Sequence, residues 1–82
     1  MFFKKKHIIE CIICCTNKEM QYSVDENGHN VSICQYSFEI LEPDSMKNKI
    51  LYEYNDATTL YEIGHMYKAK FNIRDGSFEV KL

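Results

Sequence analysis

Glycine, proline and tryptophan are scarce in this sequence, which has three, one and none of them among its 82 residues. The scarcity of glycine and proline excludes flexible or low-complexity linkers, and no internal repeat is visible. We therefore expect a single domain spanning residues 1–82. A chain this short buries only about 60–65% of its unfolded surface, so it has little room for a deep enzymatic cleft beside its core.

A positive charge excess is also absent, because 12 acidic residues outnumber 10 basic ones and the net charge is −2. Proteins that bind phosphate backbones usually carry a strong basic excess. Long apolar runs are missing too. The stretch Ile8–Ile13 follows three lysines as in a leader peptide, but it is short, contains Glu10 and precedes no small-residue cleavage site. We expect a buried strand there, no membrane insertion and a cytoplasmic location.

Cysteine is present, but not in the spacing of a secreted disulfide framework. Cys11, Cys14 and Cys15 crowd into one β-prone run, and Cys34 stands alone. Cys11 and Cys14 match half of a zinc motif, yet an extended strand would point their sulfurs to opposite faces. We expect four reduced cysteines that act as small apolar residues, without a metal or another cofactor.

Apolar and polar residues alternate with a period of two along most of the chain, and this pattern predicts strands. The clearest pair, residues 67–73 and 78–82, flanks Asp75-Gly76, a two-residue hairpin signal because both positions favour positive φ. This turn would place Phe71 opposite Val80, apolar against apolar on one face.

Two further turns are predicted upstream. Asn27-Gly28 would set Val24 opposite Val31, and the weaker candidate Asn17-Lys18 would set Cys15 opposite Met20. The resulting three-strand meander would present a single apolar face. Its members would be Ile9, Cys11, Ile13, Cys15, Met20, Tyr22, Val24, Val31 and Ile33.

After Ile33 the apolar set shifts by one residue, which indicates a β-bulge or a sharp bend of the kind that closes small barrels. The shifted set is Cys34, Tyr36, Phe38 and Ile40. Beyond Pro43 another strand is expected, with Ile50, Tyr52 and Tyr54 on one face. Asp56–Gly64 has the N-cap and C-terminal glycine of a short helical turn.

The expected order is therefore four strands, a short helix and two strands. It predicts a mostly β domain, a small OB-like or SH3-like barrel, with a two-layer β roll as the alternative.

The outer face of the last hairpin carries four cations, Lys68, Lys70, Arg74 and Lys81. In the expected register Lys70 lies opposite Lys81, an unfavourable pairing of like charges. This face is a candidate site for single-stranded nucleic acid. The acidic balance of the chain instead favours a solvated face or an edge protected by lysines.

The strand that contains Ile8 and Ile12 is apolar on both faces, whereas one core normally requires one apolar face per strand. Ile8 and Ile12, with Phe2 and Phe3 nearby, are surplus unless the fold itself or a partner covers them. These four residues are the candidate interface for a protein partner or for a homodimer.

The histidines His7, His29 and His65 are scattered, and no set of nucleophile, base and orienting residue can be assembled from the sequence. The sequence therefore favours a small non-catalytic interaction module, encoded by a phage or mobile element. A single-stranded nucleic-acid binder is the first alternative, and an enzyme is the least favoured.

The segment Tyr61-Glu-Ile-Gly64-His-Met-Tyr67-Lys-Ala-Lys-Phe71-Asn72 resembles the end of small uncharacterised bacterial and phage β-barrel domains. Their pattern is Tyr-x-Val/Ile-Gly-x-x-Tyr-x-Val-x-Phe/Tyr-Asn, and it covers about a quarter of this chain. The bacterial members often follow transmembrane helices, and this sequence departs from them by lacking such a helix and by having Ile73 where they often have proline. The resemblance implies a fold and carries no site residues.

The cysteine interpretation makes the first prediction. When the natively folded protein is purified and then denatured, thiol titration should find four free thiols, and elemental analysis should find no stoichiometric zinc. Fewer thiols or bound zinc would contradict it.

Overall fold

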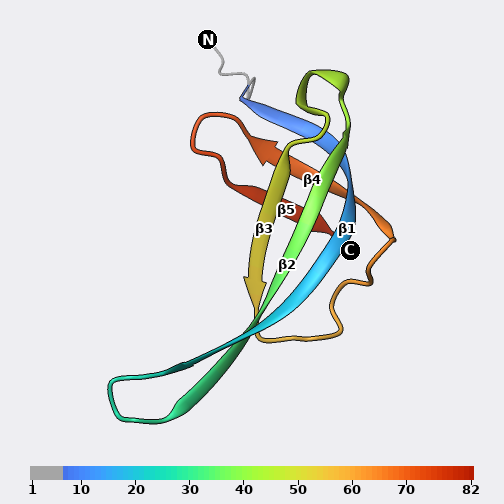
Figure 1. Cartoon of the computed structure of the whole chain (residues 1–82). Helices are drawn as coiled ribbons and strands as arrows, with labels where there is room; N and C mark the ends of the chain where they lie inside the picture. Colours follow the sequence, from blue (N-terminus) through green and yellow to red (C-terminus); the bar gives the residue numbers. More distant parts are fainter. Residues whose placement is uncertain (1–6) are drawn as a thin grey trace.

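The structure is a computed structural model that describes residues 7–82, most of them in five antiparallel strands (Figure 1). The elements are β1 (Ile8–Val24), β2 (Asn30–Glu42), a 3-10 turn η1 (Asp44–Met46), β3 (Ile50–Asn55), β4 (Met66–Asn72) and β5 (Phe78–Lys81). They form one sheet in the order β3-β2-β1-β4-β5, which curls into a half-barrel. The mostly β class is confirmed, whereas the six strands and the short helix expected from the sequence are replaced by five strands. None of the described segments is a helix with the length and apolarity needed to cross a bilayer.

β1 is the central strand and serves both halves of the sheet. Its first half pairs with β4, beginning with Ile8 opposite Asn72, and its second half pairs with β2. The turn expected at Asn17-Lys18 is therefore wrong, because β1 runs straight through it with a register shift after Cys15. A β-bulge adds one residue and reverses the alternation, so it leaves the same sequence pattern as a two-residue turn. Neither Asn17 nor Lys18 has the positive φ that a tight hairpin turn requires.

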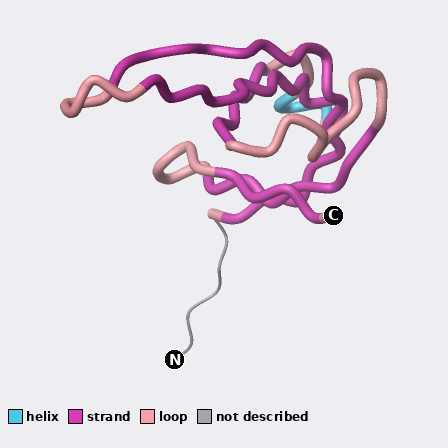
Figure 2. The backbone as a smooth tube through the Cα atoms, turned by 90° about the horizontal axis from the view of Figure 1, so that it is seen from below, coloured by secondary structure: helices cyan, strands magenta, loops and turns pink. Residues whose placement is uncertain are grey.

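The far end of the β1–β2 hairpin, residues 21–33, projects beyond the other strands, and we call it the arm (Figures 1 and 2). The arm makes the molecule elongated, with extents of 51 × 33 × 20 Å and a radius of gyration of 15.1 Å. A compact chain of this length would have a radius of gyration of about 12 Å. Tyr22 and Val24 are 77% and 63% exposed on the arm, because no third strand reaches them.

The tip of the arm is the hairpin that Asn27-Gly28 predicted, but its register is one residue off. Asp25 closes the tip, since its Oδ1 accepts the backbone N–H groups of Asn27 at 2.9 Å and His29 at 2.8 Å. The loop therefore spans five residues, and Val24 lies opposite Asn30 rather than opposite Val31.

A shift of one residue moves a strand's side chains to the other face. The single apolar face expected for the meander is consequently split. Tyr22 and Val24 continue the concave face, whereas Val31 and Ile33 lie on the outer face.

The concave face of the half-barrel holds the core. The predicted shifted set of β2 is confirmed, since Cys34, Tyr36, Phe38 and Ile40 are all fully buried. The other buried core residues are Cys11, Ile13, Cys15, Leu51, Tyr61, Ala69 and Phe71. The expected irregularity near Ile33 is absent, and the register shifts lie between Ile12 and Ile13 and between Cys15 and Asn17.

The segment between β3 and β4 is an irregular loop, so the helical turn expected over residues 56–64 is wrong. Tyr36 satisfies two backbone groups of this loop, because its hydroxyl donates to the carbonyl of Ala57 and accepts the N–H of Leu60 at 3.2 Å. Lys18 Nζ also donates to the carbonyl of Thr58 at 2.9 Å. Side chains from the sheet thus satisfy backbone groups that a helix would have satisfied internally.

The β4–β5 hairpin keeps its predicted apolar face but not its predicted register. Phe71 lies opposite Phe78 rather than opposite Val80, because a longer turn separates the strands. Asn72 Oδ1 accepts the N–H of Arg74 at 2.8 Å, and Asp75 Oδ1 accepts the N–H of Ser77 at 2.9 Å. The register differs by an even number of residues, so the paired side chains of both strands remain on their expected faces. Ile73 and Leu82, which were expected to extend the apolar face, lie in the turn and beyond β5 and are 54% and 79% exposed.

This turn gives a stability prediction. Gly76 has a φ of 78°, where a β-branched residue is strained, so Gly76→Val should lower the free energy of unfolding by more than about 1 kcal/mol. Gly76→Asn is the matched control, because asparagine tolerates this conformation, and it should lose less. Urea unfolding of the three proteins checks this, and equal midpoints would remove the strain argument.

Candidate interaction surface

β3 forms one edge of the sheet, and among residues 7–82 β2 is the one strand that pairs with it. The direction of its backbone groups follows from the bulge at its start. Ile40 donates its N–H to the carbonyl of Lys49, and its own carbonyl accepts the N–H of Asn48, both at 2.9 Å. Ile40 is therefore a residue whose backbone points toward β3.

In an antiparallel ladder, residues that point their backbone groups at a given neighbour alternate with residues that point away. Phe38, two residues from Ile40, is paired with Leu51 in the observed register. The backbone groups of Leu51, Glu53 and Asn55 accordingly face β2. Those of Ile50, Tyr52 and Tyr54 face the open edge, and within residues 7–82 no loop or side-chain hydrogen bond reaches them.

The same three residues place their side chains on the outer face of the sheet. Ile50, Tyr52 and Tyr54 are 44%, 54% and 53% exposed. A row of hydrogen bonds fixes Tyr54, because Gln35 Nε2 donates to its hydroxyl at 2.9 Å and Gln21 Nε2 donates to Gln35 Oε1 at 3.1 Å. The open edge thus combines free main-chain groups with ordered apolar and aromatic side chains.

The inner side of β3 is anchored to the core. Leu51 is buried, and the Tyr61 hydroxyl donates to Glu53 Oε2 at 2.8 Å. Burial raises the pKa of the Tyr61 hydroxyl, and the Glu53 carboxylate raises it further, so this group stays protonated and remains a donor at neutral pH. The edge strand is therefore held in place from its buried side.

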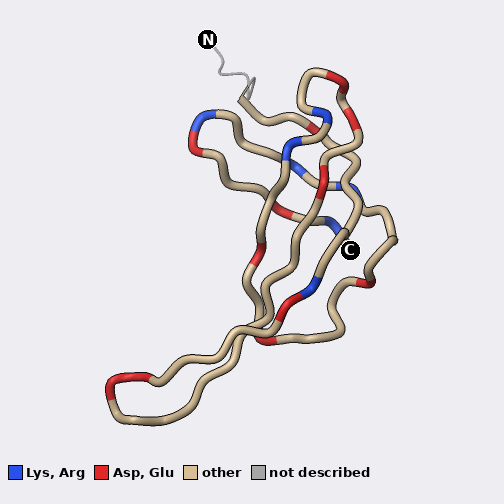
Figure 3. Tube along the Cα trace, viewed as in Figure 1, with Lys and Arg blue, Asp and Glu red and all other residues tan. Residues whose placement is uncertain are grey.

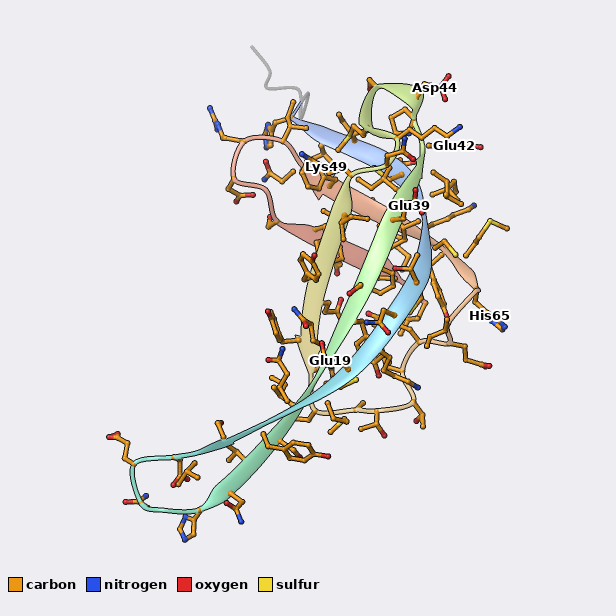
Figure 4. The ribbon with its side chains drawn as sticks, in the orientation of Figure 1. Glu19, Glu39, Glu42, Asp44, Lys49 and His65 are labelled. Carbon is orange, nitrogen blue, oxygen red and sulfur yellow. The ribbon has the colours of Figure 1, made fainter. Side chains whose placement is uncertain are left out.

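Natural sheets usually protect their edges with lysine, proline, bulges or very short strands. The opposite edge, β5, has only four residues, including Lys81 and Glu79. β3 has six residues, and Glu53 is its single charge (Figure 3). The bulge and Lys49 lie just before the strand begins, and Figure 4 shows Lys49 at that end. β3 is thus the unprotected edge of this sheet.

The interface predicted from the sequence lies elsewhere. Ile8 and Ile12 occupy the outer face of β1 and are half-buried, while Phe2 and Phe3 lie outside the described residues. Ile12 lies directly opposite Lys68, whose methylene stem is long enough to cover an apolar neighbour. The surplus apolar face of β1 is therefore partly covered within the fold.

Three of the four predicted cations meet on the outer face. Lys68, Lys70 and Lys81 line a groove of 470 Å³ together with Ile12 and two glutamates, Glu10 and Glu42. Arg74 lies in the β4–β5 turn and does not line it.

The charge pairing across this groove differs from the expected one. Lys70 lies between Glu10 and Glu79 instead of opposite Lys81, and Lys81 lies opposite Lys68. The groove therefore carries mixed charge, which weakens the attraction for a phosphate backbone.

The cysteines lie as a strand dictates. Cys11 and Cys15 are buried on the concave face, and Cys14 is half-buried on the outer face. Burial raises the pKa of the Cys11 and Cys15 thiols, which keeps them protonated at neutral pH. In the part of the chain that is described, no three His, Cys, Asp or Glu side chains gather as metal ligands would.

Sequence reasoning identified the strand and the shared face of Ile50, Tyr52 and Tyr54, but it missed that this strand is an edge. The available signal was the absence of lysine and proline from the strand. Only the topology shows which strands have a single neighbour.

Comparison of the chain with protein-family models, with curated proteins and with solved structures finds no match.

The open edge gives a prediction for amide hydrogen exchange. In dilute protein the amides of Leu51 and Glu53 should exchange slowly, since they donate to β2, and those of Tyr52 and Tyr54 should exchange at rates near those of free peptide. Residue-resolved exchange by NMR measures all four. Equal protection of the two sets in a monomer would show that the edge is not open.

Proposed function

We propose that this chain is a small non-catalytic interaction module that binds an extended protein segment along the open edge of β3. The observation that supports this most directly is the set of backbone groups on Ile50, Tyr52 and Tyr54 that no other described residue pairs with. In β-augmentation, an extended peptide pairs with such an edge through main-chain hydrogen bonds, and its alternate side chains provide specificity.

The outer face suggests what the bound segment contains. A strand paired with β3 places alternate side chains beside Ile50, Tyr52 and Tyr54, where aromatic and β-branched partners pack best. A segment with alternating apolar residues and no proline at its paired positions suits this surface. The added strand would extend the curled sheet toward a closed OB-like or SH3-like barrel. We place this activity in the cytoplasm, in a protein of a phage or mobile element.

A peptide selection tests the proposal. Ten-residue peptides selected from a displayed random library against the immobilised protein should show alternating apolar residues, and binding should protect the amides of Tyr52 and Tyr54. Tyr52→Lys places a charge among the side chains that face the bound peptide. It should raise the Kd of the selected peptide by about tenfold or more, which is about 1.4 kcal/mol of binding free energy. Lys70→Gln, on the same face but in β4, beyond β2 and β1 from the open edge, is the matched control and should bind normally.

A library that yields no binder, or a binder equally sensitive to both substitutions, would count against the edge. The cost of Tyr52→Lys to folding should stay within about 0.5 kcal/mol, because the side chain is exposed. Thermal unfolding separates a binding defect from a folding defect.

Single-stranded nucleic acid is the second candidate, favoured by the meeting of Lys68, Lys70 and Lys81 in one groove. Titration of labelled oligonucleotides at two salt concentrations tests it. Binding that weakens steeply with salt and is lost in Lys68→Glu would favour this reading over the protein-binding one.

A further inference from the structure

The open edge of β3 is complementary to itself, and we propose that a second copy of this chain is its occupant, paired antiparallel about a two-fold axis through Tyr52. This inference rests on the proposed function, because it names the extended segment that the edge binds. It assigns a register as well as a partner.

The register follows from which residues face the edge. A hydrogen-bonded pair requires residues whose backbone points outward on both strands, so Ile50, Tyr52 and Tyr54 of one copy must meet the same set in the other. A two-fold axis at Tyr52 pairs Tyr52 with its own copy and Ile50 with Tyr54 in both directions. Every outward-facing residue of β3 is then satisfied in both copies.

Registers centred on the residues next to Tyr52 are less favourable for pairing. Moving the axis to Glu53 sets two like charges directly opposite each other, which is destabilising. Moving it to Leu51 brings Tyr54 opposite Asn48, whose N–H is already donated to Ile40. In the register centred on Tyr52, Glu53 lies opposite Leu51 and Lys49 lies opposite Asn55, so no like charges meet.

The side chains support the same arrangement. Opposed residues of an antiparallel pair share a face, so the exposed side chains of both copies form one continuous outer row. In it, each Ile50 packs against a Tyr54 and the two Tyr52 rings lie side by side. The small net charge of −2 adds little repulsion between the copies.

Sedimentation over a wide concentration range is the first measurement. The wild type should approach twice the chain's mass as concentration rises, whereas Tyr52→Lys should stay monomeric and folded, and Lys70→Gln should behave as the wild type. A wild type that is monomeric at all concentrations would overturn the self-pairing. If such a monomer still binds the selected peptides, the proposed function stands; if it binds none, both fail.

Cysteine cross-linking tests the register, in a Cys14→Ser background that removes the half-buried thiol. Cα atoms of a hydrogen-bonded pair lie about 5.5 Å apart, within reach of a disulfide, so Tyr52→Cys should form a covalent dimer under mild oxidation. Tyr54→Cys is the matched control. Each Tyr54 lies four residues along the ladder from its copy, a separation of about 14 Å, and should not cross-link.

Cross-linking of Tyr54→Cys instead of Tyr52→Cys would overturn the register.

A third measurement needs no substitution. The amides of Tyr52 and Tyr54 should gain protection from exchange as wild-type concentration rises, while protection at Leu51 stays constant. A dimer without this gain pairs through another surface and contradicts the inference.

Discussion

A short stretch of β1, Ile12–Cys15, is hydrogen-bonded on both sides, and the two halves of the sheet meet only there. β2 pairs with it on one side, and β4 and the loop before β4 pair with it on the other. Ile13 and Cys15 are fully buried at this crossing. The register shifts on either side of Ile13–Cys15 bend the sheet at this point, and the bend makes one concave face deep enough to hold the core.

The aromatic cluster on that face holds the open side of the half-barrel. Phe38 lies at its centre, with ring centroids 5.0 Å from Tyr61 and 6.0 Å from Phe78 in edge-to-face geometry. Tyr36 holds the loop after β3 through its hydroxyl, and Tyr61 returns from that loop to Glu53. β3 is thereby held both by its ladder with β2 and by contacts on the concave face. A strand already held in its binding conformation loses less conformational entropy when it pairs with a partner.

Much of the fold could be predicted from alternation alone, because burial on one face leaves a period of two in the sequence. The face carried by Tyr36 and Phe38 and the apolar face of the β4–β5 hairpin are examples. The exact registers could not be predicted, because Asp25, Asn72 and Asp75 cap longer turns with their side chains, and a two-letter turn signal does not show this. The bulge after Cys15 and the hairpin expected there leave the same pattern.

The candidate site was harder to predict than the core, for a physical reason. A core residue is recognisable by its own apolarity, whereas an edge is defined by a neighbour that is missing. Tyr52 reads the same in the sequence whether its strand is central or at the edge. The long arm was missed for the same reason, since Tyr22 and Val24 follow the apolar pattern of residues that a third strand would bury.

The two neighbours of β1 lie at very different distances along the sequence, and this bears on how the chain folds. The β1–β2 hairpin closes through a loop of five residues, whereas Ile8 pairs with Asn72, near the other end of the described chain. Contacts between segments close in the sequence cost less loop-closure entropy, so we expect the hairpin and then β3 to form before β4 joins the sheet. Until residues 66–72 pair with it, β1 itself is an exposed edge with apolar side chains on both faces. A partly folded chain of this protein therefore exposes to chaperones an apolar strand that the finished fold places at the centre of its sheet.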